Sequence, residues 1–202
     1  MKLNNDSGIK NIIKILKNNG IGVLPTDTIY GLVGSVLSKK AVEKIYKLRR
    51  RNLKKPMIIL IGSIKDLKIF KIKLKRPTQK ILQKIWPGKI SVILPCPKKE
   101  FSYLHRGKKS LAFRLPKKQS LIKLLEKTGP LVAPSANPEN EKPAQTISQV
   151  KKYFGDEIDF YLNNGKLNSK PSTLIALKNG RIFIKRKGAK NLTSLLKKLD
   201  KK

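Results

Sequence analysis

Short runs made entirely of apolar residues are the feature that most constrains the fold of this chain. Met57–Ile61 is such a run, bounded by Pro56 and Gly62. It is too short to cross a membrane and does not alternate with polar residues, which is typical of a strand covered on both faces of a sheet. Similar runs occur at Ile21–Leu24 and Leu131–Ala133, and runs interrupted by one polar residue occur at Ile90–Leu94 and Leu111–Leu115. The chain therefore favours a sheet buried between two layers.

Segments with apolar residues at helical spacing separate these runs. After an N-cap at Asp6 or Ser7, a first helix is expected to stop at Asn19-Gly20. Further helices are predicted at residues 41–51, 78–86, 120–127 and 147–154, and further strands at 160–162, 173–177 and 181–185. The Lys178-Asn179-Gly180 turn predicts that the last two strands form a hairpin.

This order of elements predicts a single three-layer α/β domain with a mixed parallel and antiparallel sheet. The expected domain spans residues 1–190. The Lys-rich residues 191–202 are expected to form a surface helix that frays.

The chain is strongly basic. It carries 47 Lys and Arg residues against 12 Asp and Glu, a formal net charge of +35 over 202 residues. Such an excess attracts polyanions such as RNA and nucleotides. The lysines are, however, spread along the whole chain together with many Ile and Asn residues, as a compositional drift toward Lys would also produce. Both explanations stay open at this point.

Cys96 and His105 are the only cysteine and histidine of the sequence. This excludes an internal disulfide, a Cys-based zinc cluster and a His-rich metal site. The N-terminal residues show no apolar stretch behind a basic patch, and no apolar run approaches the ~20 residues that span a bilayer. We therefore expect a cytoplasmic protein without membrane contact.

Three short polar side chains follow the first predicted strand, in the segment Pro25-Thr26-Asp27-Thr28-Ile29-Tyr30-Gly31-Leu32. Ligands of open α/β sheets sit beyond the carboxyl ends of strands, where a Thr hydroxyl can bind a small polar substrate. An ordinary strand-to-helix turn with a capping Thr explains the same residues. The pattern alone does not separate these two interpretations.

Two segments carry cations that could bind an anion. In the first, Arg49, Arg50 and Arg51 lie at the end of a predicted helix, and Lys54 and Lys55 follow them before a predicted strand. Arginines there suit phosphate oxygens, although a solvated helix end explains them too.

A second cation, Arg114, lies inside the apolar strand Leu111–Leu115. A buried charge needs a partner, either a ligand carboxylate or phosphate or a structural Asp or Glu. The small number of acids favours a ligand.

Hydroxyl and amide side chains end two later segments. Ser135 and Asn137 follow the strand at Leu131–Ala133, and Ser172 precedes the hairpin that ends near Arg186. No Walker P-loop, no Gly-x-Gly-x-x-Gly and no acid–base dyad is visible, so the catalytic residues stay unassigned.

Taken together, these motifs resemble the YrdC/TsaC family of L-threonylcarbamoyladenylate synthases, from about Gly8 to Gly188. The segment Pro25–Leu32 is similar to the family's Pro-Thr-(Glu/Asp)-Thr-x-Tyr-Gly-Leu signature, and Pro134–Asn137 to its (Pro/Thr)-Ser-Ala-Asn motif. Other similar segments are Ala41–Met57, Trp86–Gly88, Leu111–Pro116, Ser172-Thr173 and Arg186–Gly188.

The sequence departs from the family pattern at several positions. The usual Lys is Arg49, and the Pro of the same motif is Asn52. The Ser-Gly that usually follows Ser-Ala-Asn is Glu139-Asn140. Lys89-Ile90 replace a Pro-Leu pair, and Pro171 occupies a position that often holds Glu.

The resemblance implies a twisted mixed sheet with a basic concave cavity in which L-threonine, bicarbonate and ATP form threonylcarbamoyl-AMP. The group would then reach position 37 of ANN-decoding tRNAs, directly or through partner proteins. It further implies Mg²⁺ bound with ATP, without a dedicated carboxylate cage. By the same resemblance, Arg49, Arg51, Ser135, Asn137, Ser172 and Arg186 bind ATP and its phosphates, and Thr26 and Arg114 bind threonine.

Two other functions fit the same residues. One is a non-catalytic module that binds structured RNA in the basic cavity. The other is a carbamoyl-transfer domain that acts on a different carbamoyl-adenylate.

Overall fold

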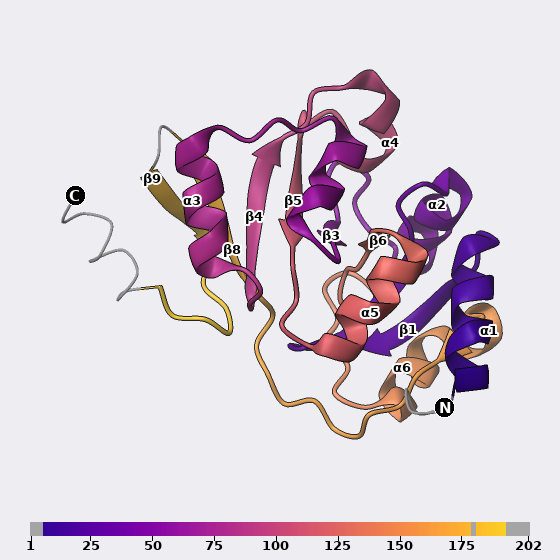
Figure 1. Ribbon diagram of the computed structural model, residues 1–202. Helices are drawn as coiled ribbons and strands as arrows, with labels where there is room; N and C mark the ends of the chain where they lie inside the picture. The colour runs from indigo at the N-terminus through magenta and orange to yellow at the C-terminus, as the bar shows by residue number, and fades with distance from the viewer. Residues whose placement is uncertain (1–5, 179–180, 193–202) are drawn as a thin grey trace.

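The computed structural model describes residues 6–178 and 181–192. The nine described strands form one mixed sheet in the order β7-β1-β2-β6-β3-β5-β4-β8-β9, which runs across Figure 1 from β9 on one side to β1 on the other. The pairs β1–β7, β3–β5 and β4–β8 are parallel, and the remaining neighbours are antiparallel. The predicted mixed sheet is therefore confirmed.

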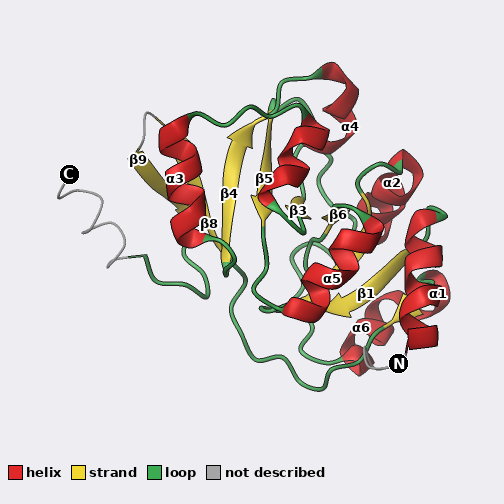
Figure 2. Cartoon of the chain, viewed as in Figure 1, coloured by secondary structure: helices red, strands yellow, loops and turns green. Residues whose placement is uncertain are grey.

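The elements follow one another as α1 (Asp6–Lys17), β1 (Ile21–Pro25), β2 (Tyr30–Ser35), α2 (Lys39–Leu48), β3 (Ile58–Leu60), η1 (Ile64–Phe70), α3 (Arg76–Ile85), β4 (Ile90–Pro95), η2 (Lys99–Phe101), α4 (Ser102–His105), β5 (Ser110–Arg114), α5 (Gln119–Thr128), β6 (Leu131–Val132), α6 (Ile147–Phe154), η3 (Gly155–Glu157), β7 (Phe160–Tyr161), β8 (Thr173–Lys178) and β9 (Arg181–Arg186). Figure 2 shows the helices in red and the strands in yellow. No helix among the described residues is long and apolar enough to span a bilayer.

Two hydrophobic clusters cover the two faces of the sheet. Successive strand residues point to opposite faces, so Ile59 packs in one cluster while Leu60 packs in the other. Helices α2, α3 and α6 contribute to the cluster of Ile59. Helices α1 and α5 bury Ile12 and Leu124 in the cluster of Leu60. This arrangement gives the predicted three layers.

Strand β2 was not predicted from the sequence. It pairs with β1 in antiparallel register from Ile21↔Gly34 to Pro25↔Tyr30, so residues 26–29 form a hairpin turn rather than a strand-to-helix turn. The sequence of β2 has no clear strand pattern because it contains Gly31 and Gly34, and glycine weakens strand propensity. Gly34 is closely packed, since an added Cβ would lie 3.1 Å from the side chains of Ala41 and Ile45.

The predicted helix at residues 41–51 ends early, at Leu48. Arg50 has a left-handed φ of 47°, and its N–H donates to the carbonyl of Lys47 while the N–H of Arg51 donates to that of Tyr46. These two bonds form a Schellman motif, which ends a helix. Arg49, Arg50 and Arg51 therefore lie on a loop and not on a helix.

The predicted hairpin is confirmed by the antiparallel pairing of β8 with β9. Its turn residues Asn179-Gly180 and most of the predicted C-terminal helix, residues 193–202, lie outside the described residues.

Candidate functional site

A cavity, here called the arginine cavity, opens over the part of the sheet that β3, β5, β4 and β8 form, in that order. Its floor includes Ile58 and Ala112, which are paired in register on β3 and β5, and Leu174 on β8. Ile58 lies two residues before Leu60 and so faces the side of the sheet that α1 and α5 cover farther along. The polar wall of the cavity consists of Thr26, Thr28, Arg49, Arg51, Arg114, Ser135, Ser172 and Arg186.

All the predicted site residues except Asn137 line this one cavity. They come from six separate places in the sequence, at residues 26, 49–51, 114, 135, 172 and 186. An isolated antiparallel bridge between Gly31 and Ser135 places the β1–β2 hairpin beside the segment that carries Ser135. Bonds from Leu32 N–H to the Pro134 carbonyl and from Ala136 N–H to the Tyr30 carbonyl hold the two segments together.

Thr26 organises its own turn. Its Oγ1 donates to the carbonyl of Ile29 at 2.7 Å and accepts from the N–H groups of Thr28 and Ile29. It also lies 3.0 Å from Oγ1 of Thr28. The Thr26 hydroxyl is thus engaged within the hairpin, and the neighbouring Asp27 and Thr28 link this turn to the rest of the site.

Arg114 has a protein partner. Its Nη2 lies 3.2 Å from Oδ1 of Asp27 in a pair whose side chains are 5% and 8% exposed, and its Nη1 donates to Oγ1 of Thr28 at 2.9 Å. The sequence favoured a ligand as the partner of the buried Arg114, but the structure provides a protein acid, Asp27. Nε of Arg114 is buried without a hydrogen-bond partner, so its N–H has no acceptor among the described residues.

Arg49 is buried against the segment of Ser135. Its Nε donates to the backbone carbonyl of Asn137 at 2.8 Å and its Nη2 donates to Oγ of Ser135 at 3.2 Å. Burial and the positive charge of Arg51 lower the pKa of Arg49 to about 10. Nη1 of Arg49 is buried without a partner, so this cation is incompletely satisfied by the protein.

Arg51 and Arg186 complete the basic wall. Arg51 donates to the carbonyls of Lys55 and Pro56 at 3.0 and 2.9 Å, and Arg186 donates to the carbonyl of Ser172 at 2.9 Å. Burial and then the charge of Arg51 lower the pKa of Arg186. Burial lowers the pKa of Arg114 as well, and Arg186 adds to this effect while Asp27 opposes it. Mutual repulsion of this kind would be relieved by a bound anion.

Asn137 does not line the cavity. It is buried, and its amide Nδ2 donates to the backbone carbonyls of Pro138 and Glu141 at 2.7 and 2.8 Å. Its side chain thus shapes the loop that follows the Ser-Ala-Asn motif, while its own carbonyl holds Arg49.

Thr28 and Ser91 were not predicted as site residues. Ser91 on β4 lies with its Oγ 2.8 Å from Oγ of Ser172, and both residues are buried. Thr28 lies within the Pro25–Leu32 motif, so its place in the site could have been predicted from the sequence. Ser91 stands in an apolar strand, and only the pairing of β4 with β8 brings it to the site.

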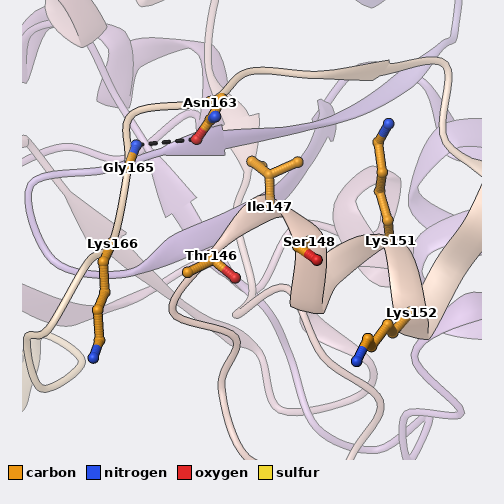
Figure 3. Close-up of a pocket in the computed structure, with 8 residues that line it drawn as sticks. All are labelled: Thr146, Ile147, Ser148, Lys151, Lys152, Asn163, Gly165 and Lys166. Atoms are coloured by element: carbon orange, nitrogen blue, oxygen red, sulfur yellow. Dashed lines mark hydrogen bonds between the residues drawn. The ribbon is translucent and has the colours of Figure 1, made fainter.

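A second hollow lies at the start of α6, apart from the arginine cavity. Figure 3 shows Lys151, Lys152 and Lys166 around it, together with Thr146 and Ser148. It shares no lining residue with the arginine cavity. Within the described part of the chain, no group of three or more His, Cys, Asp or Glu side chains could hold a metal ion.

The arginine cavity combines Arg49, Arg51, Arg114 and Arg186 with hydroxyl groups, and no acidic side chain of the described residues lines it. Such a site binds phosphates and carboxylates and stabilises negative charge that develops during a reaction.

Comparison with known proteins identifies the family. The model of the Sua5, YciO and YrdC proteins, described as "Telomere recombination", matches residues 14–188. Threonylcarbamoyl-AMP synthase of Marinobacter nauticus is 34% identical over 168 residues, which cover 81% of this chain and 88% of that protein. The synthase of Hahella chejuensis is 28% identical over 178 residues, 87% of this chain and 96% of that protein.

Solved structures agree with this match. Pyrococcus abyssi Sua5 in complex with L-threonine gives a TM-score of 0.87 at 25% identity, over 96% of this chain and 57% of that longer chain. E. coli YciO gives a TM-score of 0.82 at 23% identity, over 94% and 93% of the two chains, and supports the fold. The sequence motifs, the family match and the shared fold agree, and the chain belongs to the Sua5/YciO/YrdC family.

Proposed function

We propose that this protein is an L-threonylcarbamoyladenylate synthase. It condenses L-threonine, bicarbonate or CO₂, and ATP, and releases pyrophosphate. The relatives named threonylcarbamoyl-AMP synthase support this activity. The observation that carries it is the meeting of Arg49, Arg51, Arg114 and Arg186 in one cavity with the strand-end hydroxyls.

Two new bonds are needed. The threonine nitrogen attacks the carbon of bicarbonate, which loses water and becomes a carbamate. A carbamate oxygen then attacks the α-phosphorus of ATP, and the bond from that phosphorus to the bridging oxygen of pyrophosphate breaks. Both steps bring anions together, so they depend on positioning and on cations more than on an acid–base pair.

Arg49, Arg51 and Arg186 are proposed to hold the triphosphate and the leaving pyrophosphate. Arg49 and Arg186 both have pKa values lowered by burial and by the charge of Arg51, so an anion there restores favourable electrostatics. Ser135 and Ser172 are proposed to bind the nucleotide and the carbamate. Asn137 acts indirectly in this scheme, because its carbonyl holds Nε of Arg49.

Threonine is proposed to bind beside the β1–β2 hairpin. Arg114 keeps a free Nε for a carboxylate while Asp27 and Thr28 fix its other two nitrogens. Thr26 contributes by shaping the turn, because its hydroxyl is engaged there. Mg²⁺ is proposed to arrive bound to ATP, held by triphosphate oxygens.

The net positive charge of the chain suggests RNA as a partner beyond the small substrates. We place the protein in the cytoplasm, where the product would be passed to tRNA directly or through partner proteins. The net charge of +35 and the lysines around the α6 hollow favour contact with RNA. The same observations favour the second candidate function, a non-catalytic module that binds structured RNA.

Pyrophosphate release by the purified protein tests the proposal. Release should require ATP, bicarbonate and threonine together, and a panel of other amino acids should give less. ATP turnover that ignores threonine would point to another carbamoyl-adenylate. Tight RNA binding without any ATP turnover would support the second candidate.

A further inference from the structure

Glu139 joins the two loops that carry the predicted phosphate-binding residues. Its Oε2 accepts from the N–H of Asn52 at 2.5 Å, and its Oε1 lies 2.7 Å from Nζ of Lys55. Its own N–H donates to the carbonyl of Arg49 at 2.7 Å. One residue therefore contacts the start, the middle and the end of the 49–55 loop.

Bonds within the 49–55 loop also shape it, and Oη of Tyr46 donates to the carbonyl of Lys55 from outside. The N–H of Lys55 donates to the carbonyl of Asn52, and the N–H of Lys54 donates to the Asn52 side chain. Arg51 donates to the carbonyl of Lys55. The position of Arg51 thus depends on the turn that Glu139 and Tyr46 hold from outside.

Charge adds to this geometry. The loop holds Arg49, Arg50, Arg51, Lys54 and Lys55 within seven residues, and like charges so close repel one another. The hydrogen bonds from Lys55 and from the Asn52 backbone hold the pKa of Glu139 below its ordinary value. Glu139 in turn favours the charged form of Arg49.

An exposed ion pair alone would contribute little. The Lys55 side chain is 58% exposed, and pairs of this kind are worth about 0–1 kcal/mol. The bond to the Asn52 backbone adds to this ion pair, because a carboxylate accepts a hydrogen bond from an N–H more strongly than a neutral group does. The N–H of Asn52 is also available only because residue 52 is not proline.

We propose that Glu139 is a positioning residue that sets the 49–55 loop for binding the ATP phosphates, and that Asn52 and Glu139 act as a pair. Asn52 supplies the backbone donor and Glu139 supplies its acceptor. This inference rests on the proposed function, since it assigns the loop to ATP.

Steady-state kinetics of Glu139→Ser test the pair. The KM for ATP should rise roughly tenfold, as expected for loss of one charge-assisted hydrogen bond, while kcat changes much less. Glu139→Gln keeps an acceptor for the Asn52 N–H and should recover much of the loss. Glu141→Ser removes an exposed acid two residues away and controls for the change in net charge.

A double-mutant cycle tests the coupling. Asn52→Pro should raise the KM for ATP in the Glu139 protein but cause little further loss in Glu139→Ser, because its donor no longer has an acceptor. Asn52→Ala keeps the backbone N–H and should be milder than Asn52→Pro. Equal effects of Asn52→Pro in both backgrounds would refute the pair.

Hydrogen exchange at the Asn52 amide separates this inference from the proposed function. The amide should exchange faster in Glu139→Ser than in the wild type, whether or not the protein turns over ATP. A wild type without ATP turnover defeats the proposed function, and the exchange result still reports on the contact. If exchange and the KM for ATP both stay unchanged and only the melting temperature falls, Glu139 is a structural contact alone.

Discussion

The buried pair of Asp27 and Arg114 allows a prediction with a defined magnitude. At 3.2 Å, an effective dielectric constant of ~20 gives an attraction of about 5 kcal/mol. Desolvation offsets much of this in the intact pair, but removing one partner leaves the other charge buried and costs about 3–5 kcal/mol. Asp27→Asn keeps the shape of the side chain and should therefore lower the free energy of unfolding by about 3 kcal/mol.

Urea denaturation followed by the fluorescence of Trp86 measures this loss. Trp86 is the only tryptophan of the chain and is 5% exposed in the fold. Arg114→Met should also destabilise, and the double variant should lose less than the sum of the two single losses. The double variant thereby distinguishes the ion pair from general damage to the hairpin.

Additive losses, or a loss below about 1 kcal/mol for Asp27→Asn, would contradict this reasoning. In that case Asp27 does not compensate Arg114, and a ligand carboxylate becomes the partner that the buried guanidinium requires.

Other residues give shorter tests. Arg51→Ala should weaken ATP binding in calorimetry by about 1.5–3 kcal/mol, Arg49→Lys should be mild, and Arg50→Ala should have no effect; equal small losses at all three would mean a solvated basic loop. Arg50→Gly should stabilise the fold against urea by about 0.5–1 kcal/mol, because φ is 47° there, and destabilisation would count against the helix end described. Burial raises the pKa of Cys96 to about 11, so its thiol should stay protonated and resist a thiol reagent at pH 8 until the protein unfolds; fast labelling of the native protein would contradict this. RNA affinity should fall steeply as salt rises if phosphate contacts dominate, and a flat response would mark the Lys excess as compositional.

Much of the fold could be predicted because most strands are recognisable from a local run of apolar residues. Met57–Ile61 and Leu111–Leu115 are recognisable without knowledge of their neighbours. Strand β2 could not be recognised in this way, because Gly31 and Gly34 give it no local strand preference and its burial comes from β1 and α2. The end of α2 was misplaced because a Schellman motif with Arg at its left-handed position lacks the usual glycine.

The site could be predicted as a set of residues but not as a set of contacts. Motif positions placed Arg49, Ser135 and Ser172 together, and the structure has them in one cavity. The sequence does not show which acid reaches Arg114, because that depends on how the β1–β2 hairpin lies against β5. Asn137 illustrates the same limit, since a loop amide can serve a ligand or its own backbone equally well by sequence.

The most direct test of the central proposal is to follow bicarbonate carbon into the nucleotide product. Purified protein would be incubated with ATP, L-threonine and ¹³C-bicarbonate, and the adenylates would be analysed by mass spectrometry. We expect an adenylate that contains threonine and one labelled carbon, formed together with pyrophosphate and absent when threonine is omitted. Unlabelled product, or no adenylate from a protein that is folded and binds ATP, would contradict the proposed synthase.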